Sequence, residues 1–400
     1  MAIKLQYVRA ISYMEFLMQL IFSIYIILPI ILFYGSAVSS RGQWNDGFLS
    51  LSQSKALQGM CVLLIVFHHI SQKIYVRQDL PQLITHSLDP FVNAGFLLTA
   101  VFFFFNGYGL YKSYTSKPGY LDHFLSKRLT APLVAYYMTG LIFFALRLAL
   151  GEKIGKKLII LYMSGLVHCS PYSWYIVILI LFYVVFYLVF KRAKDARSAT
   201  IIFSLLVLAY MILGLFVPRN NYFLRGEWWY DSVFMMPLGM IFAGSEEKII
   251  SHVKRNYGRY LLIHLFLIVP MFMFSKLTIN RFGFFNDSIP YGTMCKLVSL
   301  LPRILCVYLF IALILLVSMK IRIGNKTLAF LGKYTLEIYL IHGILVEVFD
   351  HDFVGIAPSP IPIHNAFLYA ILVVLVTLPA AILLKFIERK TAAVMCGQAP

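Results

Sequence analysis

Apolar runs of about 18 residues or more recur along the whole sequence. A run of this length crosses the hydrocarbon core of a bilayer when it is helical, and a helix satisfies its own backbone hydrogen bonds in lipid. Of the 400 residues, 60% are hydrophobic and 13% are charged, whereas a soluble domain has about a quarter of its residues charged. The sequence therefore predicts an all-α polytopic integral membrane protein, folded as a bundle of helices.

We expect about eleven transmembrane helices. Their approximate ranges are 14–34, 55–72, 92–112, 132–150, 173–190, 199–217, 232–244, 259–276, 299–319, 333–349 and 364–386. The seventh range is short, and residues 157–166 are compatible with a further half-helix.

The distribution of Lys and Arg predicts the orientation of the chain, whose net charge is +18. Alternate loops and the C-terminal end carry most of the basic residues: Lys112, Lys117, Lys127, Arg128, Lys191, Arg192, Lys194, Arg197, Lys248, Lys254, Arg255, Arg259, Lys320, Arg322, Lys326, Lys333, Lys385, Arg389 and Lys390. Basic loops remain in the cytoplasm and meet anionic lipid, so we expect a multi-pass plasma-membrane protein with a cytoplasmic C-terminus. The charge bias around the first span is weak, so that span either runs from the outer side inward or lies in the membrane interface.

The distribution of charge and the spacing of the cysteines bear on possible partners and ligands. The basic residues are dispersed among apolar spans, which argues against nucleic acid as a partner. The five cysteines, at positions 61, 169, 295, 306 and 396, have no paired spacing that indicates a metal site or a disulfide framework.

Residues 54–72 form an apolar run with polar groups at both ends. In a helix, Lys55, Gln58 and His69 lie on nearly one face, and Lys55 and His69 are about 21 Å apart along the axis. Polar groups at membrane depth are costly, and they are therefore candidates for function. His68 points about 100° away from His69, so we do not expect both to meet one substrate.

Four sequence segments, taken in their order along the chain, match motifs of a known protein family. They are Lys55–His69, Phe102–Leu110 (FFFFNGYGL), Phe124–Pro132 (FLSKRLTAP) and Leu331–His342 (LGKYTLEIYLIH), with a weaker fifth segment at Ser173–Tyr175. Together they resemble the acyltransferase-3 family of membrane acyltransferases. The resemblance covers residues 51–390, which implies a ten-helix core domain there. Residues 1–50 would be an extension with one extra transmembrane helix, and residues 391–400 a C-terminal tail.

The chain departs from the family pattern at three positions. The family places a basic residue eleven positions before its histidine. Here that position is Gln58, and Lys55 lies one turn earlier on the same face. Asn106 stands where Ser is usual, and the basic loop keeps Lys127 and Arg128 without a later arginine.

The resemblance implies transfer of an acyl group, expected to be acetyl, from cytoplasmic acyl-CoA to a hydroxyl of a glycan, glycolipid or related acceptor. His69 would act as general base, because neutral imidazole is available near pH 7. His68 is the second candidate, and an acyl-histidine intermediate is an alternative role. No metal is implied.

Further residues are assigned through the same resemblance. The phosphates of coenzyme A would be bound by a cytoplasmic group, for which the candidates are Lys55, Gln58, Lys127, Arg128 and Lys333. Candidates for the substrate site or the acyl path are Asn106, Trp174, Glu337, Tyr339 and His342. Positive-inside topology is an alternative explanation for most of these basic residues. A histidine on an apolar helix is more often a packing residue, and we interpret His264 in this way.

Two other functions fit the same sequence. A transporter or exporter of a glycolipid or small molecule would use intramembrane His and Glu side chains to relay protons. Neither repeated halves nor a pair of broken helices, which many transporters contain, is evident in the sequence. A non-catalytic subunit of polysaccharide assembly would keep the fold without the reaction.

Overall fold

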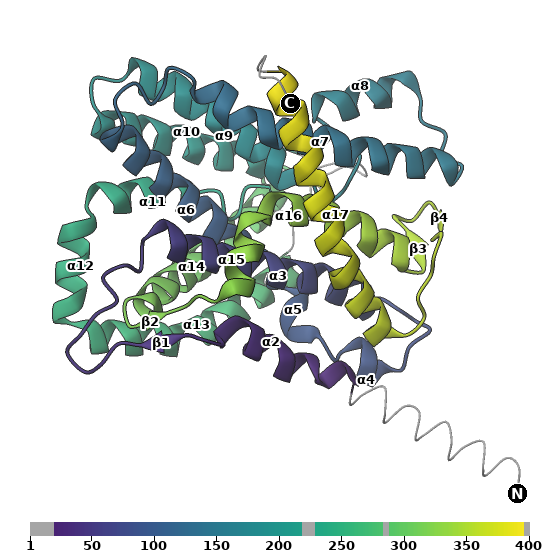
Figure 1. Ribbon diagram of the computed structural model, residues 1–400, viewed down its shortest axis with the longest axis horizontal. Coiled ribbons are helices and arrows are strands. Elements are labelled where there is room, and N and C mark those ends of the chain that lie inside the picture. The colour runs from purple at the N-terminus through teal and green to yellow at the C-terminus, as the bar shows by residue number, and fades with distance from the viewer. Residues whose placement is uncertain (1–19, 218–228, 283–287, 396–400) are drawn as a thin grey trace, which may run out of the picture.

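We analysed a computed structural model that describes residues 20–217, 229–282 and 288–395 (Figure 1). The start of the first predicted span, the end of the C-terminal tail and Cys396 lie outside the described residues. The remaining four cysteines are buried free thiols.

The described residues are mostly helical. The helices are α2 (Ile24–Phe33), α3 (Leu51–Tyr75), α4 (Gln82–Thr85), α5 (Asp89–Val92), α6 (Gly95–Ser116), α7 (Phe124–Ala149), α8 (Lys156–Ser164), α9 (Trp174–Arg192), α10 (Ala196–Phe216), α11 (Met235–Gly244), α12 (Glu246–Arg255), α13 (Tyr257–Phe282), α14 (Tyr291–Ser318), α15 (Lys326–Lys333), α16 (Thr335–Phe349) and α17 (Ala366–Met395). There are two antiparallel strand pairs. β1 (Ala37–Val38) pairs with β2 (Ile321–Arg322), which is distant in the sequence, and β3 (Asp352–Phe353) pairs with the adjacent β4 (Ala357–Pro358).

The all-α membrane class is confirmed, but the count of eleven spans is not. A helix lies at each of the eleven predicted ranges. Within the described part of the chain, seven helices are long and apolar enough to cross a membrane, namely α3, α7, α9, α10, α13, α14 and α17. The number is eight if α15 and α16, which are bent by 80° at their junction, form one span. Helices α2 and α11 are apolar but short, and α8 occupies the predicted half-helix.

Helix α3 is the central element of the bundle. In its most apolar window 67% is buried, against 17% for α13 at the periphery. It touches α15 without intervening side chains: a Cβ at Gly59 would lie 2.3 Å from the Leu328 carbonyl oxygen, and one at Gly332 would lie 2.2 Å from the Lys55 carbonyl oxygen. The glycine of the LGKY segment is therefore needed for close packing of α15 on α3.

A second close contact joins α6 to α11. A Cβ at Gly107 would lie 1.8 Å from the Met236 carbonyl oxygen, and one at Gly239 would lie 2.1 Å from the Phe104 carbonyl oxygen. Gly107 belongs to the FFFFNGYGL segment, so this sequence pattern also marks a helix crossing.

Helix α2 runs antiparallel to α3. Near its start, the Tyr25 ring lies 5.9 Å from the Phe91 ring, which is itself 5.9 Å from Phe67 in the second half of α3. At its end, the Asn325 side chain donates hydrogen bonds to the carbonyls of Ile31 (2.9 Å) and Tyr34 (3.0 Å), close to where α3 begins. These contacts place α2 alongside α3.

Candidate active site

Two cavities lie along opposite halves of α3. The first, about 630 Å³ in volume, is lined by His68, His69, Gln72, Lys73, Trp174 and Arg303, among others, and we call it the histidine cavity. The second, about 590 Å³, is lined by Lys55, Gln58, Asn106, Lys112, Lys117 and Arg128, among others, and we call it the basic cavity. Two residues, Thr99 and Tyr339, line both cavities.

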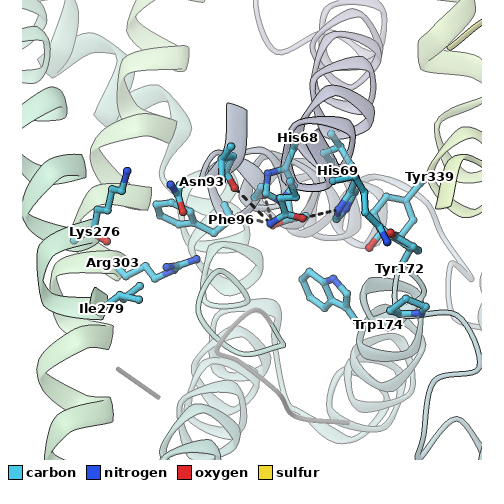
Figure 2. Close-up of a pocket in the computed structure, with 18 of the residues that line it drawn as sticks. His68, His69, Asn93, Phe96, Tyr172, Trp174, Lys276, Ile279, Arg303 and Tyr339 are labelled. Atoms are coloured by element: carbon cyan, nitrogen blue, oxygen red, sulfur yellow. Dashed lines mark hydrogen bonds between the residues drawn. The ribbon is translucent and has the colours of Figure 1, made fainter. Parts of the chain in front are cut away.

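His69 faces the histidine cavity and not the lipid. Its ring centroid lies 4.7 Å from that of Tyr172, and Figure 2 shows the two side chains next to each other. The centroid of the His342 ring is 5.2 Å from that of His69. Its Nδ1 lies 3.2 Å from the Gln72 side-chain oxygen, and the Gln72 amide nitrogen donates to the Val92 carbonyl at 3.4 Å. Because the Gln72 oxygen only accepts, Nδ1 of His69 carries the proton, and Nε2 has the free lone pair that a base requires.

His68 lines the same cavity as His69, although the two side chains leave the helix in different directions. Their ring centroids are 4.7 Å apart. The Nδ1 of His68 donates to the Phe91 carbonyl at 2.8 Å, and a Cβ at Gly95 would lie only 2.4 Å from its Nε2. The cavity extends from α3 to the start of α6, so separation on the helix does not exclude His68 from the site.

A group of charged and polar side chains holds the Tyr172 ring beside His69. The Tyr172 hydroxyl donates to Glu347 Oε1 at 2.5 Å, and the other oxygen of Glu347 accepts from Lys73 at 2.9 Å and from the Val354 amide at 2.8 Å. Lys73 also pairs with Asp350 at 3.2 Å. Burial, reinforced by Glu347, raises the pKa of Tyr172, so its hydroxyl remains a proton donor.

The opposite side of the histidine cavity is formed by α13 and α14. Figure 2 shows His68 and His69 between Arg303 and Lys276 on one side and Tyr172 and Tyr339 on the other. Arg303 pairs with the buried Asp231 at 2.6 Å, and its guanidinium lies 4.0 Å from the centre of the Phe96 ring.

The basic cavity contains some of the residues predicted to bind the donor, and two cations that were not predicted. Lys55, Gln58 and Arg128 line it, as do Lys112 and Lys117. Arg128 donates to the Tyr120 hydroxyl at 2.8 Å, and Lys112 pairs with Glu246 at 2.9 Å.

Two predicted donor-binding residues lie elsewhere. Lys127 and Lys333 are exposed and are not among the residues that line the basic cavity. Lys333 lies over the Tyr334 ring, with its ammonium 5.2 Å from the ring centre.

The five residues predicted for the acyl path divide into two groups. Trp174 lines the histidine cavity, Asn106 lines the basic cavity, and Tyr339 lines both. Glu337 and His342 are fully buried and line neither.

These two buried residues contact neighbouring residues outside the cavity linings. Glu337 accepts a hydrogen bond from Lys385 at 2.6 Å. His342 donates from Nδ1 to the Ile338 carbonyl at 3.0 Å, and its ring supports His69 from behind.

Sequence reasoning missed several residues of the histidine cavity, among them Tyr172, Arg303 and Glu347. Glu347 was detectable as an acidic residue within an apolar run, because placing a charged side chain at membrane depth costs free energy and therefore indicates a functional role. Tyr172 and Arg303 had no comparable signal, because their partners Glu347 and Asp231 lie far away in the sequence.

A cluster of potential metal ligands lies outside both cavities. The ligand atoms of Asp79, His351 and His364 are within 4.8 Å of one another. The guanidinium of Arg77 lies among them: it donates to Asp79 at 2.7 Å and to the His364 carbonyl at 2.8 Å, and it contacts His351. The hydrogen bonds from Arg77 lower the pKa of Asp79 to about 2. The cluster is therefore an ion-pair network in which Arg77 supplies the cation.

Comparison with known families identifies the family of this chain. Residues 52–386 match the family model described as an acyltransferase domain, that of the acyltransferase-3 family. Comparisons with curated proteins and with solved structures found no match. The matched range contains both histidines, all the cavity cations named above, and the two residues shared by the cavities. Because the match extends over most of the sequence, the protein belongs to the acyltransferase-3 family of membrane acyltransferases.

Proposed function

We propose that this acyltransferase transfers an acyl group, specifically acetyl, from cytoplasmic acyl-CoA to a hydroxyl of a glycan or glycolipid, with His69 as the general base. The observation that carries the proposal is the pair of cavities along α3. The basic cavity has four cations and no acidic residue among its described lining residues, the histidine cavity contains two histidines, and the two cavities meet at Thr99 and Tyr339.

The basic cavity suits the donor. Coenzyme A carries three phosphates, and Lys55, Lys112, Lys117 and Arg128 all face this one space. Lysines act as point charges, whereas the arginine fork binds two phosphate oxygens at once. Glu246 offsets part of the charge of Lys112, so the other three cations are the main candidates for phosphate binding.

The histidine cavity suits a sugar acceptor. Trp174 supplies an apolar ring, and Asn93, Ser275 and Asn280 supply polar groups. This combination of flat apolar surface and hydrogen-bonding groups is what a pyranose ring requires.

The reaction follows from the protonation state of His69. Nε2 of His69 takes the proton of the acceptor hydroxyl as the oxygen attacks the thioester carbonyl carbon. A carbon–oxygen bond forms and the carbon–sulfur bond breaks. The coenzyme A sulfur leaves with the electron pair and receives the proton from the imidazolium. The products are the O-acyl ester and coenzyme A, and His69 returns to its neutral form.

His69→Ala tests the base. Membranes of expressing cells are supplied with labelled acetyl-CoA, and label bound to membrane or surface glycans is measured. We expect loss of at least about 100-fold, the usual contribution of a general base. His264→Ala is the matched control, because His264 is a buried histidine that lines neither cavity. Unchanged transfer by His69→Ala at normal protein level would refute the assignment.

Binding of acetyl-CoA to the purified protein separates this function from transport of a glycolipid. Our proposal requires binding that weakens when Arg128 is replaced by Gln. Absence of binding in the wild-type protein would remove the donor assignment and favour the transporter.

A further inference from the structure

We infer that Thr99 and Tyr339 form a wall one side chain thick between the two cavities, and that this wall restricts the donor to short acyl groups. The inference rests on the proposed function, because it concerns the acyl group that passes from the basic cavity to His69. It identifies Tyr339 as the residue that determines acyl-chain length.

The position of Tyr339 shows how thin the wall is. The side chain is 5% exposed, yet it borders both cavities. On one side its ring lies 5.4 Å from Tyr175, which lines the basic cavity. On the other side it lies 6.0 Å from His342, whose ring supports His69. The aromatic series Tyr175, Tyr339, His342 and His69 therefore runs from one cavity to the other.

The two halves of the wall are held differently. Thr99 is 5% exposed, and its hydroxyl lies 3.0 Å from the Gly95 carbonyl of its own helix and 3.4 Å from the Ser232 hydroxyl. Tyr339 is positioned by the packing of its ring against Tyr175 and His342. Rotation of the Tyr339 side chain is thus the smallest movement that would open a passage, while Thr99 stays in place.

This geometry sets a limit on the acyl group. The thioester carbonyl has to reach His69, so the acyl chain passes the wall ahead of the carbonyl and enters the cavity that the acceptor also needs. An acetyl group requires a small opening and little volume. Each added methylene must pass the same gap and compete with the acceptor, and one methylene in a fitted site changes selectivity by about 10-fold or more.

Chain-length selectivity tests the inference. Membranes of expressing cells receive labelled acetyl-CoA, butyryl-CoA or octanoyl-CoA, and transfer of label is compared. We expect the wild type to prefer acetyl over octanoyl by at least about 10-fold. Tyr339→Ala should reduce that preference, whereas Tyr339→Phe, which keeps the ring, should retain it. Equal transfer of acetyl and octanoyl by the wild type, or wild-type preference in Tyr339→Ala, would overturn the inference.

A second measurement does not depend on acyl transfer. A reporter cysteine is placed at Asn93 in the histidine cavity, in a chain whose native cysteines are replaced by Ser or Ala. A small impermeant thiol reagent is then applied to inside-out vesicles, from which it reaches the basic cavity. We expect labelling to be about 10-fold faster when Tyr339→Ala is added, and unchanged when Tyr339→Phe or His69→Ala is added. Labelling from the opposite membrane face should not respond to any of the three.

The two measurements distinguish the wall from the reaction. If labelling responds to Tyr339→Ala but the wild type transfers no acyl group, the wall is supported and the proposed function fails. If the wild type transfers acetyl but labelling is unchanged by Tyr339→Ala, the proposed function is supported and the wall is refuted.

Discussion

At the scale of single residues, the three neighbouring imidazoles differ in access more than in hydrogen bonding. His68 and His342 each donate from Nδ1 to a backbone carbonyl, and His69 donates to the Gln72 side chain. His342 is fully buried, whereas His69 faces the cavity. Of the three, His69 has an Nε2 that faces the cavity and an Nδ1 that bonds to a side chain, that of Gln72. The hydrogen bond to Gln72 can therefore be removed by mutation.

Gln72→Leu should lower acyl transfer about 10-fold, because it removes one hydrogen bond that orients the His69 ring, and such a bond contributes about 1 kcal/mol. The measurement is transfer of labelled acetyl by membranes with equal amounts of protein. Gln78→Leu, beyond the end of α3 and outside both cavities, is the matched control. Wild-type transfer by Gln72→Leu would show that the hydrogen bond does not position the base.

Lys117→Ala should weaken binding of acetyl-CoA by about 10-fold, because it removes one charge from the basic cavity. Lys127→Ala should have little effect, because Lys127 lies outside that cavity. Titration of the purified variants with acetyl-CoA measures both. An effect confined to Lys127 would favour the assignment made from the sequence motif.

At the scale of elements, α6 contains one glycine that is closely packed against α11 and one that has open space beside it. Gly107→Ala would place a Cβ 1.8 Å from the Met236 carbonyl oxygen and should force α6 and α11 apart, whereas a Cβ at Gly109 meets nothing within 4 Å. We expect Gly107→Ala to destabilise the protein by about 1–3 kcal/mol or more, and Gly109→Ala to be tolerated. Thermal unfolding in detergent compares them, and equal midpoints would contradict the close crossing.

The segments after α3, after α16 and before α17 are joined by Arg77, Asp79, His351 and the His364 carbonyl. The pKa of Asp79 falls from its ordinary value of 3.8 to about 2 in the folded protein. A lowered carboxyl pKa stabilises the folded state above the ordinary value, and this contribution disappears as the pH falls through about 2. The wild type should therefore be more stable than Asp79→Asn near pH 5, and the difference should shrink towards pH 2. A difference that grows on acidification would refute the ion pair.

At the scale of the whole molecule, the sequence predicts the helices better than it predicts the cavities. The apolar runs correctly predict a helix at each expected range, because a span in lipid must satisfy its own backbone hydrogen bonds. The same runs do not give the number of membrane spans, since α2 and α11 are short, α15–α16 is bent by 80°, and α6 is not among the helices that are long and apolar enough to cross. The family pattern identifies His69, Asn106 and Tyr339, which line one or both cavities. The cavities depend on contacts between distant segments, such as Tyr172 with Glu347, which no local pattern encodes.

The orientation of the whole molecule decides which cavity would meet the proposed cytoplasmic donor, acyl-CoA. The Tyr114 hydroxyl, at the end of α6, donates to the Phe190 carbonyl at 3.4 Å, so the turn between α9 and α10 lies on the side of the basic cavity. That turn carries Lys194 and follows Lys191 and Arg192, and it should therefore remain in the cytoplasm.

A cysteine at Lys194 should thus be protected from an impermeant thiol reagent in intact cells and labelled after lysis, and a cysteine at Gln78 should be labelled in both. These sites lie in the turn after α9 and in the segment after α3, where a small side chain disturbs no helix packing. The opposite pattern would place His69 towards the cytoplasm and the basic cavity towards the outside. A cytoplasmic donor could not then use the basic cavity, so this one measurement constrains the direction of the entire proposed reaction.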